Sequence, residues 1–238
     1  MYIKIPTGKY DRILMLRALA TSITANDNHP FDVVAPTEYQ STMSLFEGKY
    51  AAYKAAKNAS ETNRQSRDLM IKDIETSVVK IAQYLKVKFY GNEKAIVDWG
   101  FPVLLGKRSG IIARDRKTES NIRLYKQILA KHVDDGENSI LSSYDMAAFE
   151  TKLNSIIATH TNFKENRTLA RIYAKQHQNL LKDLLAMARK IARNLRMRED
   201  MEPKDLEVFG FTVLESYASA DTDEDEEGLV EEDIDQAS

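Results

Sequence analysis

Hydrophobic and polar residues follow one another along this chain with the three- and four-residue spacing of amphipathic helices. Apolar side chains at that spacing occupy one face of a helix. The clearest such stripe in the second half consists of Leu181, Leu184, Leu185, Ala188, Ala192 and Leu195. The first half has a matching stripe, which consists of Ile71, Ile74, Val78, Ile81, Ala82 and Leu85. The pattern therefore predicts a long helix in each half.

Two further helices are predicted before each of these stripes. An opening helix is expected near residues 9–26 and again near 118–134. The next has apolar positions in the first half at Tyr39, Met43, Phe46, Tyr50 and Tyr53, and in the second half at Phe149, Leu153, Ile156, Ile157 and Phe163. Such helices can bury their stripes only against one another, so we expect helical bundles.

One phrase occurs twice, as KAIVDWGFPVLL at residues 94–105 and as KDLEVFGFTVLE at residues 204–215. Its glycines, Gly100 and Gly210, are 110 residues apart. The same offset, held without a gap over roughly 90 positions, predicts an internal duplication. It pairs Leu14 with Leu124, Leu19 with Leu129, Ala20 with Ala130, Tyr39 with Phe149, Phe46 with Ile156 and Ile81 with Ile191.

The repeated phrase also predicts how each half ends. A short fourth helix is expected near residues 92–99 and 203–209. A glycine just after a helix adopts the left-handed conformation, and the next side chain folds back on the last turn. We therefore expect structural caps at Trp99, Gly100 and Phe101 and at Phe209, Gly210 and Phe211.

These observations predict an all-α fold of two tandem, pseudo-repeated, up-down helical bundles. Each bundle would contain three long helices and a short capping helix, and about 110 residues suffice for such a domain. The expected segments are a first bundle at 1–105, a basic linker at 106–116, a second bundle at 117–216 and a disordered acidic tail at 217–238.

Several phrases of the first half are also typical of a known family. They are an alanine- and tyrosine-rich helix at Tyr50–Asn58, the phrase at Ile81–Leu85, the turn Gly91-Asn92-Glu93 and the ending Gly100-Phe101-Pro102-Val103. This run resembles a widespread bacterial family of helical-bundle proteins of uncharacterised function. The second half keeps only the skeleton, with Arg198-Glu199-Asp200 in place of the glycine turn. The resemblance implies a helical bundle and brings no catalytic residues; many family members continue into a fibronectin-type β-sandwich, where this chain has its acidic tail.

Motifs for catalysis or metal binding are missing from the sequence. The chain has no cysteine, and its four histidines, His29, His132, His160 and His177, form no HxxxH or HExxH pair. GKRSG at 106–110 lacks the phosphate-loop pattern. Asp73 and Asp183 occupy equivalent positions and are interpreted as exposed helix charges. We therefore expect no catalytic residues, no metal site, no cofactor and no enzymatic activity.

The location expected from the sequence is cytoplasmic. The chain has neither a signal-peptide pattern at its start nor a run of 18 apolar residues, so membrane insertion is not expected. Association with a virion or another particle stays open.

The charge is divided unevenly along the chain. The net charge is −2, but the segment from Asp221 to Asp235 has ten acidic residues and no basic one. Residues 1–220 therefore hold all 34 basic residues against 26 acidic ones. The acidic end can be read as a solvated tail that aids solubility, as a cover for the basic body, or as an element that docks on a basic partner.

A basic stripe flanks the apolar stripe of the second half. It consists of Lys182, Arg189, Arg193 and Arg196, and the linker adds Lys107, Arg108, Arg114, Arg116 and Lys117. The stripe can be an ordinary solvated flank, a contact for nucleic-acid phosphates, or a contact for an acidic partner. The matching places in the first half are Lys72, Val79, Gln83 and Lys86, so the stripe belongs to one half only.

The function predicted from these features is that of a non-enzymatic scaffold, adaptor or assembly subunit. Its partners would be other proteins or further copies of itself, contacted through helical faces and the acidic tail. Leu229, Val230 and Ile234 would serve as apolar anchors within the tail. The alternative is a nucleic-acid-associated protein that binds phosphates through the basic stripe and is masked by the tail.

Overall fold

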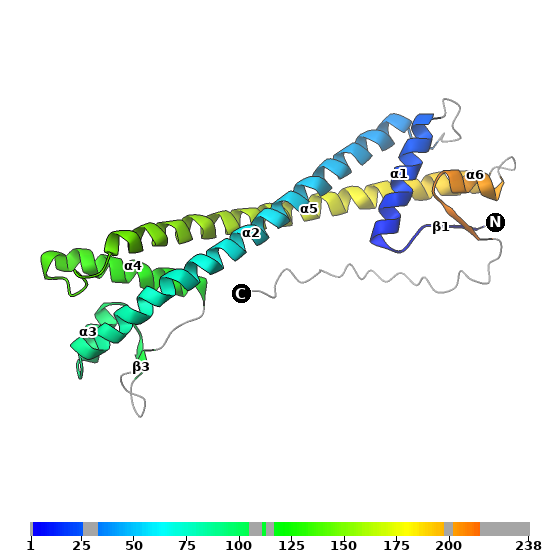
Figure 1. The fold of residues 1–238 in the computed structure, drawn as a ribbon. Helices are drawn as coiled ribbons and strands as arrows, with labels where there is room; N and C mark the ends of the chain where they lie inside the picture. Colours follow the sequence, from blue (N-terminus) through cyan, green and yellow to red (C-terminus); the bar gives the residue numbers. More distant parts are fainter. Residues whose placement is uncertain (1, 26–32, 105–110, 113–116, 198–201, 215–238) are drawn as a thin grey trace. The chain divides into compact units, whose positions relative to one another are not determined.

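The computed structural model describes residues 2–25, 33–104, 111–112, 117–197 and 202–214, and the fold is all-α apart from four very short strands (Figure 1). Its helices are α1 (Lys9–Ala25), α2 (Pro36–Lys88), α3 (Glu93–Asp98), α4 (Thr118–Asp135), the 3₁₀ turn η1 (Gly136–Asn138), α5 (Met146–Arg196) and α6 (Pro203–Val208). Its strands are β1 (Tyr2–Lys4), β2 (Val103–Leu104), β3 (Ile111–Ile112) and β4 (Thr212–Leu214).

Each half of the chain has one very long helix where two separate helices were predicted. The 53 residues of α2 and the 51 residues of α5 run on through stretches that have no apolar stripe. In α2 that stretch, residues 54–70, contains no glycine or proline, and it is rich in alanine and in ion pairs one turn apart. Good helix formers and these pairs sustain the helix without a packed face. The prediction of three long helices per half was therefore wrong.

The described chain forms two compact units, and each unit draws on both halves of the sequence. Unit 1 combines the residues up to Ala56 with those from Leu169 onward, and unit 2 consists of Lys57–Thr168. This composition differs from contiguous bundles at 1–105 and 117–216. Helices as long as α2 and α5 cannot be covered along their whole length by one short helix, so their two ends pack against different partners. The predicted linker, apart from Ile111 and Ile112, and the predicted tail lie outside the described residues.

Unit 1 packs α1, the first part of α2, the last part of α5 and α6 around one apolar core. Its innermost side chains include Leu16, Leu19, Tyr39, Phe46, Leu184, Ala188, Ile191, Leu195 and Leu206. Two hydrogen bonds tie the helices together. The Tyr39 hydroxyl donates to the carbonyl of Leu16 at 3.0 Å, and the Ser22 hydroxyl donates to the carbonyl of Val208 at 3.0 Å. Burial of the Tyr39 phenol raises its pKa.

Unit 2 packs α3, α4, the last part of α2 and the first part of α5 around a second core. Its innermost side chains include Ile74, Val78, Ile81, Leu85, Trp99, Phe101, Tyr125, Ile128 and Ile156. The rings of Tyr125 and Phe149 meet edge to face, with centroids 6.1 Å apart. Within this unit α2 and α5 are antiparallel, because Arg67 lies beside His160 while Asp73, further along α2, pairs with Lys152.

A two-stranded antiparallel sheet joins the two halves of the sequence in each unit. In unit 1, β1 pairs with β4, and Ile3 lies opposite Val213. In unit 2, β2 pairs with β3, and Val103 lies opposite Ile112. Each sheet therefore connects the start of one half to the end of the other.

The repeated glycine phrases end α3 and α6. Gly100 and Gly210 have φ angles of +89° and +81°. After α6, the Gly210 amide donates to the Glu207 carbonyl at 2.9 Å and the Phe211 amide donates to the Leu206 carbonyl at 3.3 Å. These two bonds are those of a Schellman motif. Trp99, Phe101, Phe209 and Phe211 are all buried beside their caps.

Candidate functional site

The four basic residues of the predicted stripe are exposed side chains on α5 in unit 1, and two more residues extend their line. The steps between the six are 4, 7, 7, 4 and 3 residues, which keeps them on one face of a helix. We call this face the basic ridge: Arg171, Lys175, Lys182, Arg189, Arg193 and Arg196. At a rise of 1.5 Å per residue it is about 37 Å long. The opposite face of α5 holds the buried residues Leu184, Ala188, Ile191 and Leu195.

The charge of the basic ridge is largely uncompensated within the described residues. Lys175, Lys182, Arg189 and Arg193 form no ion pair with any residue that the structure describes. Residues 169–196 of α5 contain seven basic residues and one acidic residue, Asp183. Unscreened like charges repel one another, so this face favours an anionic ligand.

The equivalent stretch of α2 in unit 2 has a different surface. Residues 59–86 contain five basic and four acidic residues. At an offset of 110 from the basic ridge stand Glu61, Gln65, Lys72, Val79, Gln83 and Lys86. Glu61 pairs with Arg64 at 2.7 Å, and hydrogen bonds from Arg64 and Gln65 lower the pKa of its carboxyl to about 2. The two stretches therefore bury similar stripes and differ in what they present to solvent.

A buried histidine lies beneath the start of the basic ridge, in unit 1. His177 is only 2% exposed, and its Nδ1–H donates to the carbonyl of Tyr173 at 3.0 Å. Its Nε2 is buried without a hydrogen-bond partner among the described residues. The rings of Tyr53 and Tyr50 surround it at centroid distances of 5.0 and 5.4 Å. Burial lowers the pKa of this imidazole, which is therefore neutral in the folded chain at pH 7.

A second histidine lies at the equivalent place of unit 2. His160 Nδ1 accepts a hydrogen bond from the Arg67 guanidinium at 3.3 Å, and its Nε2 lies 3.8 Å from Glu119. Arg67 also stacks on the ring of Phe163, 4.9 Å from its centroid. Burial, then the charges of Lys164 and Arg67, lower the pKa of His160, while Glu119 opposes the shift. In both clusters aromatic or guanidinium groups pack against the imidazole.

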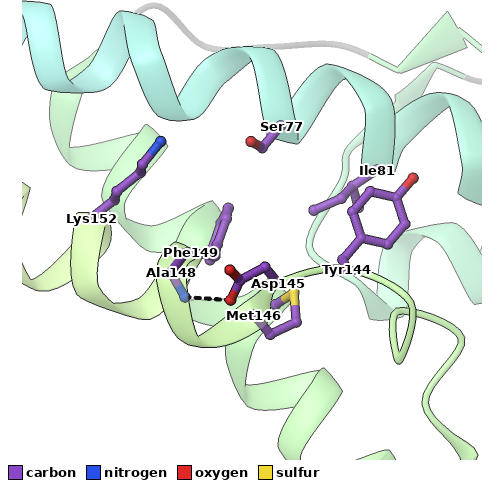
Figure 2. Close-up of a pocket in the computed structure, with 8 residues that line it drawn as sticks. All are labelled: Ser77, Ile81, Tyr144, Asp145, Met146, Ala148, Phe149 and Lys152. Atoms are coloured by element: carbon purple, nitrogen blue, oxygen red, sulfur yellow. Dashed lines mark hydrogen bonds between the residues drawn. The ribbon is translucent and has the colours of Figure 1, made fainter.

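The pocket drawn in Figure 2 is a small hollow of about 150 Å³ in unit 2, between α2 and the start of α5. Its walls are largely apolar, with Ile81, Met146 and Phe149. Two charged groups at its rim, those of Asp145 and Lys152, are already engaged. Asp145 accepts the Ala148 amide at 2.9 Å as a helix cap, and Lys152 pairs with Asp73 at 2.7 Å.

Among the residues that the structure describes, no three histidine, aspartate or glutamate side chains gather as a metal ion would require. None of the helices in the described ranges has both the length and the apolar character needed to span a bilayer.

Other predicted site residues are only partly placed. Lys117 is exposed at the start of α4, whereas Lys107, Arg108, Arg114 and Arg116 fall outside the described part of the chain. The same holds for the predicted tail anchors Leu229, Val230 and Ile234. Asp73 and Asp183 are both exposed.

Arg171 and Lys175 are not part of the basic stripe predicted from the sequence, and His177 was predicted only to belong to no metal-binding pair. Extending the spacing of the stripe toward the N-terminus finds Lys175 seven residues and Arg171 eleven residues before Lys182. The sequence gives little indication that His177 is buried, because the repeat pairs it with an arginine, Arg67. Only the structure shows the aromatic rings that pack against it.

No family model matches this chain, and neither does any curated protein or solved structure. The resemblance to the bacterial helical-bundle family stays a prediction.

Proposed function

We propose that the protein is a non-enzymatic interaction protein whose basic ridge binds an acidic segment of a partner protein. The observation that carries this proposal is the difference between the basic ridge and its counterpart in unit 2. At four of the six corresponding positions the counterpart has glutamate, glutamine or valine, and it still buries its apolar face in a core, so the core of such a unit does not require a cation at those four positions. A surface charge that the fold does not need is best explained by a ligand.

Ionic contacts alone give a weak and salt-sensitive complex. An exposed ion pair is worth about 0.2–1 kcal/mol, so the four cations that form no ion pair among the described residues contribute at most about 4 kcal/mol, which corresponds to a Kd of about 1 mM. Apolar contacts would strengthen it. Ile172 and Met197 are 47% and 79% exposed and lie next to the two ends of the basic ridge on α5. An acidic segment with a few aliphatic residues therefore fits this surface best.

Nucleic acid is the second candidate ligand. The straight row of cations on the basic ridge suits a phosphate backbone. Such binding weakens steeply as the salt concentration rises, because the release of counterions then gains less free energy. The six ridge positions include no aromatic residue on which a base could stack, which argues against recognition of single-stranded nucleic acid.

The test compares two labelled probes, an acidic peptide with aliphatic residues and a DNA duplex, by fluorescence anisotropy. The variant Arg189→Glu/Arg193→Glu/Arg196→Glu should lose at least about tenfold in affinity, since it removes three pairs and adds repulsion. The control, Lys72→Glu/Lys86→Glu, reverses charge at the two cationic counterpart positions in unit 2 and should bind as the parent does. Equal binding by all three chains would exclude the basic ridge, and preference for the duplex would select the second candidate.

We also propose that the chain is an internal duplication whose halves are exchanged between the two units. The order strand, helix, long helix, short helix, strand occurs twice. At an offset of 110, buried Phe46, Ile74 and Ile81 coincide with buried Ile156, Leu184 and Ile191. The cluster of Tyr50, Tyr53 and His177 likewise coincides with His160, Phe163 and Arg67.

In the helices that precede the long ones, α1 and α4, the buried residues of the two halves correspond at an offset of 109, and not at the offset of 110 that holds for α2 and α5. The offset of 109 places buried Leu16 and Leu19 opposite buried Tyr125 and Ile128. The offset of 110 instead places Leu14, which is 44% exposed, opposite half-buried Leu124. One residue is therefore added in the second half between α4 and α5.

A further inference from the structure

The chain carries its own complement to the basic ridge. The ridge presents six cations along one helix face, and the segment 221–235 carries ten carboxylates and no cation. Within that segment Leu229, Val230 and Ile234 provide the aliphatic residues that the ridge surface fits. The two surfaces therefore match in charge and in apolar content.

The acidic segment starts close enough to reach this surface. Strand β4 ends at Leu214, belongs to unit 1 and is held there by its pairing with β1. Phe209 and Phe211, just before β4, share a core with Leu195 at the last turn of α5. Residues 215–220 can span about 20 Å when extended, and from this length and the shared core we infer that Asp221 can reach Arg196.

The lengths also agree along the basic ridge. The ridge measures about 37 Å, and fifteen residues can extend over about 50 Å. A segment running from Arg196 toward Arg171 would place Leu229 about 27 Å beyond Asp221 if fully extended. Its aliphatic residues would then approach the exposed Ile172 at the far end.

We propose that residues 221–235 fold back onto the basic ridge of the same chain and compete there with an acidic partner. The competition with an acidic partner rests on the proposed function, whereas the contact between residues 221–235 and the basic ridge does not. A tethered segment acts at an effective concentration of about 1 mM, so contacts that are weak between separate molecules are populated within one chain. Partner binding would then require displacement of this segment.

The contact is tested by a single spin label in the full chain. Because the chain has no cysteine, Thr222→Cys provides a unique attachment site in the acidic segment. At about 50 mM salt, paramagnetic relaxation should weaken the amide signals of residues 182–196 of α5, and about 500 mM salt should restore them through screening. Arg189→Glu/Arg193→Glu/Arg196→Glu should abolish the effect, whereas Lys72→Glu/Lys86→Glu should leave it intact. Unaffected ridge signals, or an effect that survives reversal of the ridge, would overturn the contact.

The same label separates the remaining outcomes. A second sample mixes chain that carries the spin label but no ¹⁵N with ¹⁵N-enriched chain that carries no spin label. The ¹⁵N signals of this mixture should be unaffected, and a loss of signal there would assign the contact to a second copy of the chain instead. Deletion of residues 219–238 should strengthen binding of the acidic peptide by at least about twofold, because a contact with a Kd of about 1 mM is about half occupied at an effective concentration of about 1 mM. Equal affinity with and without the tail would refute the competition while the proposed function stands. A peptide that binds neither chain would refute the proposed function while the spin-label contact stands.

Discussion

His177 illustrates how one buried side chain ties stability to pH. Its imidazole is enclosed by aromatic rings in unit 1, and its pKa is lowered mainly by burial. An unfolded chain binds a proton there below about pH 6.5, and the folded chain does so only at lower pH. The free energy of unfolding therefore falls as pH drops below about 6.5, by up to about 1.4 kcal/mol per pH unit for each such histidine.

Replacing this imidazole should flatten the pH dependence. His177→Phe keeps an aromatic ring in the cluster and removes the titrating group. Between pH 7.5 and 5.5 the variant should lose about 1 kcal/mol less stability than the parent, as measured by urea unfolding. The remaining dependence includes that of His160, whose pKa is also lowered. Identical losses in the two chains would contradict burial of His177.

Glycine is required at position 210 for two separate reasons. Its φ of +81° strains any other residue, and an added Cβ would lie 2.8 Å from the Ala18 Cβ and 3.2 Å from the Met15 carbonyl oxygen. Gly91 is a matched control, because its φ is +79° and no atom lies within 4 Å of an added Cβ. Gly210→Ala should therefore cost at least about 1 kcal/mol more than Gly91→Ala in chemical denaturation. Equal costs would show that α1 does not approach this cap.

At the scale of elements, the helical stripes and the glycine caps could be predicted from sequence, but the continuity of the long helices could not. The apolar stripes around Phe46 and Ile74 are separated by a stretch that buries few residues, and periodicity alone cannot distinguish an exposed helix from a loop. Helix propensity and charge spacing in that stretch were the missing signal. The basic ridge was predicted over four residues because those four flank the strong apolar stripe of the second half, which is weaker around Arg171.

Gly48 provides a test of this continuity within α2. It is an exposed helix position where an added Cβ meets no atom within 4 Å. Gly48→Ala should therefore stabilise the chain by about 0.5–1 kcal/mol, because alanine favours a helix interior. Thermal or urea unfolding measures the gain. Destabilisation would indicate that the helix is interrupted near this residue.

At the scale of the whole molecule, the composition of the units could not be predicted because the repeat offset is the same whether the halves fold separately or exchange segments. The structure places α1 in a core with Leu184 and Ile191 of α5, more than 150 residues away. Residues 1–105 alone would lack that partner surface.

Fragments test this arrangement. Residues 1–105 should show no cooperative unfolding as a monomer, and mixing them with residues 106–238 should restore helicity and a transition like that of the intact chain. Circular dichroism with analytical ultracentrifugation measures both, and it also shows whether two copies of the fragment pair with each other. A monomeric fragment that unfolds cooperatively would support contiguous bundles instead.

The central claim is that one surface, the basic ridge of unit 1, binds an acidic ligand while its counterpart in unit 2 does not. Mapping by ¹H–¹⁵N spectra, including arginine Nε signals, tests it most directly when the acidic peptide is titrated into the chain that lacks residues 219–238. The account predicts saturating shifts confined to residues 171–197, with residues 61–86 of α2 unchanged. Shifts of equal size on both stretches, or none on α5, would contradict it.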